Sequence, residues 1–166
     1  MTTAPGSARA QFSIKRTYAA SIHEAWALWT TKAGIESWWG PEGFDVTVTS
    51  LDLRPGGELV YLMTATAPEQ VAFMKQAGMP LSSPTRAFFT EVAPTRRLGF
   101  TCIVDFVPGV ESYEAATLVE LTARGRQTDL VLTLEAMHDE QWTNMAVMGW
   151  EQELGKLATA LSAKAR

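Results

Sequence analysis

The sequence contains a single cysteine, two histidines and no block of like charge, and each shortage excludes a class of protein. The lone thiol, Cys102, cannot form a disulfide within the chain. With only two histidines beside it, a zinc site is not expected, and we predict neither a metal nor a cofactor. The net charge of -4 comes from 14 basic and 18 acidic residues without a basic cluster, which argues against a nucleic-acid partner.

Long apolar runs are also missing. No segment approaches the ~20 apolar residues of a membrane span, and the first ten residues have no apolar core of the kind that a signal peptide needs. We therefore predict a cytoplasmic protein with no membrane span. Residues 1–10 are small and polar and are predicted to be a disordered tail. Residues 11–163 are expected to form one domain, and residues 164–166 a short tail.

The longest helical pattern lies near the end of the chain, from Met137 to Leu161. Its apolar residues recur at intervals of three and four and therefore share one face: Thr143, Val147, Trp150, Leu154, Leu157 and Leu161. Met145 and Met148 point roughly away from that face. A helix that is apolar on two sides is usually enclosed, so we expect the rest of the chain to wrap around it.

Alternating apolar and polar residues predict the first strand, which begins at Gln11. Its apolar face includes Ile14 and Tyr18 but also carries a charge, Arg16. A buried charge needs a partner, and the available carboxylates are those of Asp52, Glu91 and Glu120. We expect a structural ion pair there rather than a catalytic one.

Two short helices and six further strands are expected after the first strand. Ser21 and Glu24 have the spacing of a capping box, which predicts a helix containing Trp26 and Trp29. A second short helix is predicted to end where glycine and proline follow Trp39. The predicted strands are Phe44 to Arg54, Glu58 to Thr66, Thr85 to Val92, Arg97 to Phe106, Glu114 to Ala123 and Thr128 to Met137. Consecutive strands closed by one helix indicate an α+β fold with an antiparallel sheet.

Residues 67–84 interrupt the strand pattern. Residues 69–77 could form a short helix between Pro68 and Gly78, and Pro80 and Pro84 would then bracket a loop. A connection of this length is often functional, commonly as a lid or an interface element.

Several residue groups in this order resemble the activator of heat-shock-protein-90 ATPase homologue family. The groups are Trp38-Trp39-Gly40-Pro41, Asp52-Leu53-Arg54-Pro55-Gly56-Gly57, Glu91-Val92-Ala93-Pro94 with Arg97-Leu98, and Gly149-Trp150 with Leu154 and Leu157-Ala158. The resemblance covers roughly residues 12–162. That family belongs to the SRPBCC (START and Bet v1-like) superfamily, so the resemblance implies a helix-grip fold. In such a fold, a curved sheet of about seven antiparallel strands wraps around a long C-terminal helix, with two short helices after the first strand.

The resemblance also implies a cavity between the sheet and the final helix, which in related families binds apolar or amphipathic small molecules. The eukaryotic namesake is a co-chaperone that relies on an additional N-terminal domain, to which nothing in these residues corresponds. The family's usual turn near residue 67 is short and contains glycine, so the 67–84 segment is a departure that would alter ligand preference if it covered the cavity mouth.

Apolar and aromatic residues are the candidates for the cavity wall. We predict a ligand-binding set of Trp38, Trp39, Met63, Phe73, Phe89, Phe100, Cys102, Val104, His138, Met145 and Met148. The first half of the final helix is expected to line the cavity, and the second half to pack in the core. Cys102 is expected to behave as a small hydrophobe. His138 could be an acid or base, but we favour a structural role in which a backbone carbonyl satisfies its ring.

Three functions remain open. The first is a non-enzymatic protein that binds a hydrophobic small molecule. The second is a protein-interaction module, co-chaperone-like or homodimeric, that uses residues 67–84. The third is an enzyme of the polyketide cyclase or hydratase type, for which His138 would be the attractive polar group; we assign no catalytic residue.

Overall fold

The computed structural model describes residues 10–40, 42–105, 107 and 109–164. Residues 1–9 of the predicted 1–10 tail, Pro41, Phe106, Pro108 and residues 165–166 lie outside the described part. The elements in chain order are β1 (Gln11–Tyr18), α1 (Ile22–Thr30), α2 (Lys32–Trp38), β2 (Phe44–Leu51), β3 (Glu58–Ala65), α3 (Pro68–Gln76), β4 (Ser82–Ala93), β5 (Arg97–Val104), β6 (Tyr113–Arg124), β7 (Gln127–Glu135) and α4 (Glu140–Lys164).

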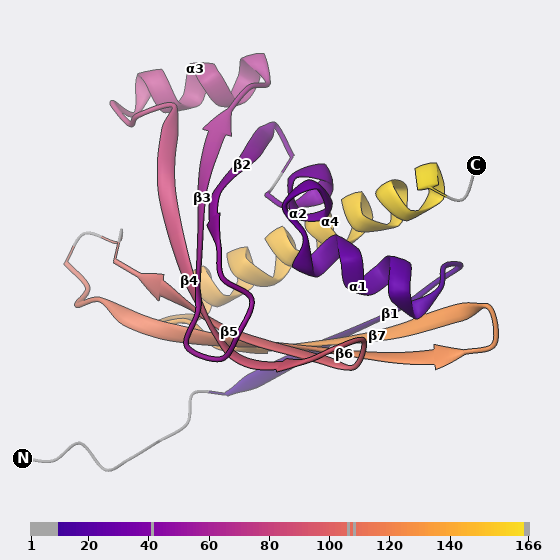
Figure 1. Cartoon of the computed structure of the whole chain (residues 1–166). Coiled ribbons are helices and arrows are strands. Elements are labelled where there is room, and N and C mark those ends of the chain that lie inside the picture. The colour runs from indigo at the N-terminus through magenta and orange to yellow at the C-terminus, as the bar shows by residue number, and fades with distance from the viewer. Residues whose placement is uncertain (1–9, 41, 106, 108, 165–166) are drawn as a thin grey trace, which may run out of the picture.

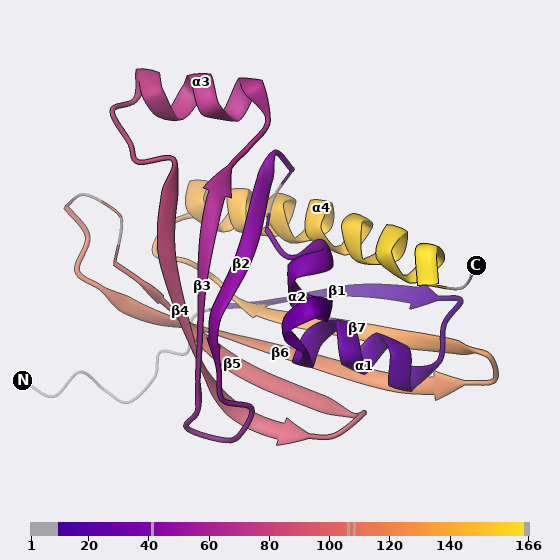
Figure 2. The same cartoon turned by 45° about the horizontal axis from the view of Figure 1, so that its top comes forward.

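All the strands belong to one antiparallel sheet in the order β1-β7-β6-β5-β4-β3-β2. The sheet curves strongly, and α4, α1 and α2 lie against its concave side (Figures 1 and 2). This is the predicted helix-grip α+β arrangement, with the two short helices directly after β1. Among the described residues, no helix has both the length and the apolar character needed to cross a bilayer.

Two register shifts help the sheet to bend. One lies in β2 between Val48 and Ser50, and the other lies in β4 between Phe89 and Glu91. A bulge adds one residue to one strand and increases the local twist. Gly99 faces the second shift, where a β-carbon on it would come within 2.7 Å of the Thr90 hydroxyl. Glycine is therefore needed where the bulged strand crowds its neighbour.

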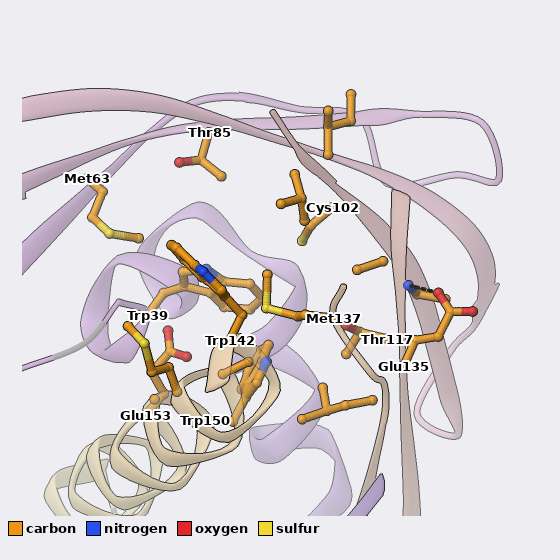
Figure 3. Close-up of a pocket in the computed structure, with 18 of the residues that line it drawn as sticks. Trp39, Met63, Thr85, Cys102, Thr117, Glu135, Met137, Trp142, Trp150 and Glu153 are labelled. Carbon is orange, nitrogen blue, oxygen red and sulfur yellow. Dashed lines mark hydrogen bonds between the residues drawn. The ribbon is translucent and has the colours of Figure 1, made fainter. Parts of the chain in front are cut away.

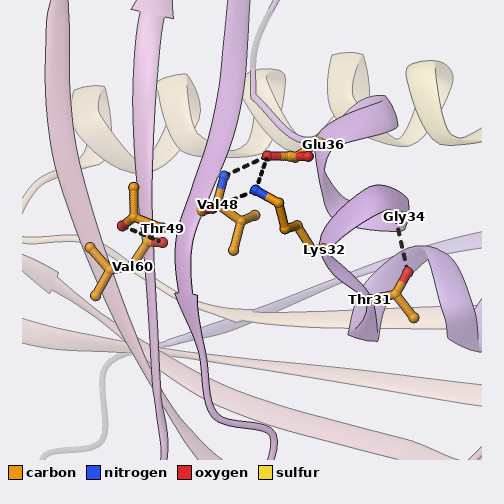
Figure 4. A network of polar contacts seen from close by, with 7 residues as sticks. All are labelled: Thr31, Lys32, Gly34, Glu36, Val48, Thr49 and Val60. Carbon is orange, nitrogen blue, oxygen red and sulfur yellow. Dashed lines mark hydrogen bonds and ion pairs between the residues drawn. The ribbon is translucent and has the colours of Figure 1, made fainter.

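The edge strand β2 is held by side chains of α2 (Figure 4). The Val48 N–H donates to the Glu36 carboxylate at 2.8 Å, and the Lys32 ammonium donates to the Val48 carbonyl at 2.9 Å. These bonds satisfy backbone groups that an exposed sheet edge would otherwise offer to another chain. The hydrogen bond from Val48 is the main reason that the pKa of Glu36 is lowered.

The core lies between the concave face of the sheet and the helices. Leu154, Leu157 and Leu161 of α4 are buried there, and the Tyr18 hydroxyl donates to the Leu154 carbonyl at 3.3 Å. Four tryptophans pack together beside them. Trp29 lies 4.6 Å from Trp38 and 6.0 Å from Trp150, measured between ring centroids, and Trp39 contacts the other three.

Some expectations for individual residues were wrong. Arg16 lies on the same side of β1 as Ile14 and Tyr18 but is exposed, and its guanidinium donates to the Lys15 carbonyl at 2.8 Å. The three carboxylates considered for it have other partners: Asp52 pairs with Arg54, and both Glu91 and Glu120 pair with Arg97. The charge needs no buried partner because it is solvated.

Two backbone expectations were also wrong. Pro84 does not lie in a loop; it lies within β4, opposite Leu62. The β5 partners begin only at Ala87, so the proline occupies a stretch of β4 that is locally an edge, where a missing N–H is tolerated. In addition, α4 begins at Glu140 and not at Met137. The Asp139 carboxylate accepts from the Trp142 N–H at 2.8 Å and caps that end.

The helix expected within the 67–84 segment is present as α3. It stands away from the rest of the molecule at the far ends of β3 and β4 (Figures 1 and 2). The Thr66 and Ala67 N–H groups both donate to the Gly43 carbonyl, which fixes the start of the segment. Phe73 is 62% exposed, whereas Met74 is buried. No residue of α3 belongs to the main core cluster.

Candidate functional site

A cavity of about 400 Å³ lies between the first half of α4 and the concave face of the sheet (Figure 3). Its walls come from α4, from β3, β4, β5, β6 and β7, from Trp39 after α2 and from Met137 between β7 and α4. The lining residues are Trp39, Tyr61, Met63, Thr85, Cys102, Ile103, Val104, Ala115, Ala116, Thr117, Leu134, Glu135, Met137, Trp142, Met145, Ala146, Gly149, Trp150 and Glu153. Most of these side chains are apolar, as in sites for small organic ligands.

One stripe of α4 forms the helix side of the cavity. Trp142, Ala146, Gly149 and Glu153 follow one another at spacings of four, three and four, which places them on one face. The small residues in the middle of this stripe leave space between the two large ends. A β-carbon on Gly149 would meet no atom within 4 Å. The absence of side-chain volume at positions 146 and 149 therefore helps to create the cavity.

The cavity opens near the first turns of α4. Met145 lines the cavity and is also 52% exposed, so one side of its thioether chain faces solvent. It lines a surface hollow as well, together with Met148 and polar residues of the same helix end. Because the methionine side chain is flexible, Met145 can change conformation to fit a molecule at the cavity opening.

Glu153 places a carboxyl group at the opposite end of the α4 stripe. Its Oε1 accepts from the Gly40 N–H at 2.8 Å, and Figure 3 shows the carboxyl group pointing from α4 toward Trp39. Burial raises the pKa of Glu153 to about 7, against the opposing effects of the Gly40 hydrogen bond and the Lys156 charge. Glu153 lines the cavity and is only partly exposed, so bulk water solvates its carboxyl group poorly.

Two other titratable groups lie near this carboxyl group on the sheet side. Burial raises the pKa of the Cys102 thiol to about 12, and the nearby Glu153 charge acts in the same direction. Burial likewise raises the pKa of Tyr61. Both groups therefore stay protonated at neutral pH, and Cys102 lacks the electropositive surroundings of a reactive thiol. It acts as a small apolar wall residue, as predicted.

The second carboxyl group of the cavity, that of Glu135, forms a hydrogen bond within the sheet. Glu135 Oε1 accepts from the Ala116 N–H at 3.0 Å, which joins the ends of β6 and β7. Among the lining residues that the structure describes there is no lysine, arginine or histidine. Lys156 lies one turn beyond Glu153, but its ammonium donates to the Gly40 carbonyl at 2.9 Å. The walls thus carry carboxyl groups without a cationic side chain.

The structure divides the eleven predicted cavity residues into three groups. Trp39, Met63, Cys102, Val104 and Met145 line the cavity. Trp38, Phe89 and Phe100 lie outside the lining because they are buried in the core. Phe73, Met148 and His138 lie elsewhere: Phe73 projects from α3, Met148 is 61% exposed on α4, and His138 is half-buried beside β6.

His138 is bonded in a way that the sequence did not indicate. Its Nδ1 lies 2.7 Å from the Tyr113 hydroxyl oxygen, which also accepts from the His138 backbone N–H at 3.2 Å. Its ring also contacts the Trp142 ring, with centroids 5.6 Å apart. The partner is thus a tyrosine hydroxyl and not a backbone carbonyl, and the histidine joins β6 to the start of α4. It is not the polar group that the enzyme hypothesis required in the cavity.

Sequence reasoning did not single out Glu153, which lines the cavity. A signal was present: the stripe Trp142, Ala146, Gly149 and Glu153 is apolar or small except at its last position. No group of three or more potential metal-ligating side chains occurs among the described residues.

A sequence profile of the family described as "Activator of Hsp90 ATPase homolog 1-like protein" matches residues 19–162. Among curated proteins, none matches the chain at a significant level. Solved structures show the same fold at low identity. A protein from Chromobacterium violaceum has a TM-score of 0.74 at 22% identity, covering 91% of this chain and 96% of its own.

Two further structures give the same result. The AHSA1 protein from Silicibacter pomeroyi has a TM-score of 0.73 at 22% identity and covers 93% of this chain and 99% of its own. A protein from Arthrobacter aurescens has a TM-score of 0.73 at 23% identity and covers 92% of this chain and 86% of its own. At these identities, the structural likeness establishes the fold alone.

Proposed function

Because the chain belongs to the Activator of Hsp90 ATPase homolog 1-like family, within the SRPBCC superfamily, we propose that it binds an apolar or amphipathic small molecule between its sheet and α4. Family membership supports a binding module in general, for a small ligand or for a protein partner. The cavity favours the small ligand. A cytoplasmic location remains a prediction.

The observation that carries the proposal is a mainly apolar cavity of about 400 Å³ with one carboxyl group at its inner end. Ligand sites are typically concave and apolar, with a small number of polar groups that orient the ligand. The small residues at positions 146 and 149 support the same interpretation. A helix built only for packing would place larger side chains there.

The experiment tests this proposal by placing a larger side chain at position 149, where it would fill part of the cavity. A Gly149→Leu variant adds a side chain where a β-carbon meets nothing, and leucine is a better helix former than glycine, so the fold should be retained. We expect it to lose binding of an uncharged apolar fluorescent probe, N-phenyl-1-naphthylamine.

The matched control is Met148→Trp. This substitution adds comparable volume on the neighbouring position, but Met148 lies outside the cavity lining and is exposed. The control should bind the uncharged probe as the wild type does. Equal binding by the wild type and the Gly149→Leu variant would rule out this cavity as the ligand site.

Protein interaction through residues 67–84 is the second candidate, and the projection of α3 is the observation that favours it. Phe73 and Met79 are 62% and 50% exposed, and an exposed aromatic on a projecting helix is typical of a contact surface. The occupant that we propose is a second copy of this chain. Deleting residues 68–80 should then convert a dimer to a monomer in light scattering. An unchanged molecular mass would contradict self-association through residues 67–84.

A further inference from the structure

We propose that the cavity selects amphipathic ligands whose polar end is a protonated amine, held by the carboxylate of Glu153. This inference rests on the proposed small-molecule function and names the ligand class for the same site. The carboxyl group lies at the inner end of an apolar cavity, so a ligand that buries its tail against the methionines and alanines can present its head to Glu153.

The charges around the cavity carry the first step of the argument. The wall contains two carboxyl groups, Glu135 and Glu153, and its described residues include no cationic side chain. A carboxylate or phosphate head would therefore meet like charge in a poorly solvated space, which is strongly unfavourable. Fatty acids and phosphorylated ligands are therefore disfavoured when Glu153 is ionised, whereas a cation would neutralise the Glu153 charge.

The aromatic rings carry the second step. Trp39, Trp142, Trp150 and Tyr61 line the same space as the carboxyl group. The faces of such rings attract cations, and the attraction is larger where water is excluded. Aromatic rings combined with one carboxylate are the chemistry that recognises an ammonium group, while the thioethers of Met63 and Met137 suit an alkyl chain.

The groups that face Glu153 leave its charge available. From α4, Lys156 directs its ammonium to the Gly40 carbonyl, and no ion pair with Glu153 within 4.0 Å occurs among the described side chains. From the sheet, Tyr61 and Cys102 are neutral groups at physiological pH. Gly40 satisfies one carboxylate oxygen and holds the side chain in place. The Lys156 charge lowers the pKa of Glu153 without forming an ion pair with it, so a ligand ammonium could be a direct ion-pair partner of the carboxylate.

The test compares three probes that share one tail: octylamine, octanol and sodium octanoate. Titrations are followed by calorimetry at about pH 8, where Glu153 is ionised and the amine is protonated. A buried charge-assisted hydrogen bond should make octylamine bind at least about tenfold more tightly than octanol, with octanoate weakest. In a Glu153→Gln variant, which can still accept from the Gly40 N–H, octylamine should fall to the affinity of octanol.

Glu151→Gln is the matched control, because Glu151 is an exposed glutamate on the same helix. It should leave all three affinities unchanged. If the three probes bind equally, or if Glu153→Gln weakens all of them alike, the amine selectivity is wrong while the binding function stands. If none of the three binds, both the selectivity and the proposed function are overturned.

Discussion

Glu153 should make the stability of this protein fall between mildly acidic and neutral pH. Its pKa is about 7 in the folded protein, above an ordinary value of 4.5, so the folded state holds this proton more tightly than the unfolded state does. Below pH 4.5 both states are protonated and the group costs nothing. As the pH rises to 7 the folded state loses stability, on the order of 3 kcal/mol in all, and above pH 7 the loss is constant.

A Glu153→Gln variant removes this titration. We expect the variant to gain stability relative to the wild type as the pH rises from about 5 to about 8. Urea unfolding at a series of pH values measures the difference, with Glu151→Gln as a variant whose difference from the wild type should not follow this curve. If the stability difference between Glu153→Gln and the wild type is the same at every pH, the pKa of Glu153 is not raised by folding, and its carboxyl group is solvated like that of an exposed glutamate.

Residue roles were the part of the site that the sequence predicted least well. Alternation predicted that Cys102 and Val104 share one face of β5; both line the cavity, but so does Ile103 between them. It could not separate them from Phe100, which has the same phase but is covered by the core. Arg16 shows a different error: we expected it to be buried and it is exposed. Spacing along a strand does not show where the opposing layer of the fold ends.

At the scale of elements, α4 contains two interior glycines that its helical structure does not require. A β-carbon on Gly149 or on Gly155 would meet no atom within 4 Å. We expect Gly149→Ala and Gly155→Ala each to raise the free energy of unfolding by up to about 1 kcal/mol, since alanine restricts the unfolded chain and favours the helix.

The two substitutions should differ in their effect on the ligand. Gly149 lines the cavity, whereas Gly155 lies on the exposed side of α4. Probe titrations with the alanine variants should therefore show weaker binding at position 149 and unchanged binding at position 155. Equal effects at both positions would indicate that helix stability, and not cavity volume, governs binding.

The order and type of the elements followed from local patterns. The capping box at Ser21 and Glu24 forms as expected, with bonds of 3.3 and 3.1 Å, because its partners lie within one turn. The Asp52-to-Gly57 turn is braced by the Arg54 guanidinium on the Asp52 carboxylate at 2.8 Å, again a local contact. The bulges in β2 and β4 were not predicted, since a bulge depends on register between strands that are distant in sequence.

At the scale of the whole molecule, the domain should fold without α3. Ala65 N–H donates to the Leu81 carbonyl, and Thr64 lies opposite Ser82. Deleting residues 68–80 therefore leaves positions 66 and 67 as a two-residue hairpin turn. Asn-Gly is the favoured sequence for such a turn, so the deletion variant should carry Asn-Gly at these two positions. We expect cooperative unfolding and a melting temperature within a few degrees of the wild type.

Circular dichroism at increasing temperature checks this expectation. The core cluster contains no residue of α3, so its contacts should survive the deletion. Loss of a cooperative transition would show that the projecting segment stabilises the sheet from outside its core. The deletion variant is also the one used in the light-scattering experiment on self-association. Its melting curve shows whether a change in mass there is caused by unfolding.

The packing of Trp29, Trp38, Trp39 and Trp150 has an optical consequence. The centroids of the contacting rings lie 4.6 to 6.0 Å apart, close enough for the excited states of neighbouring indoles to couple, and two of these rings also line the cavity. The near-ultraviolet spectrum of the unlabelled protein should therefore carry a signature of the cluster. A ligand that touches Trp39 or Trp150 would change that signature, and the protein would act as its own spectroscopic reporter of occupancy.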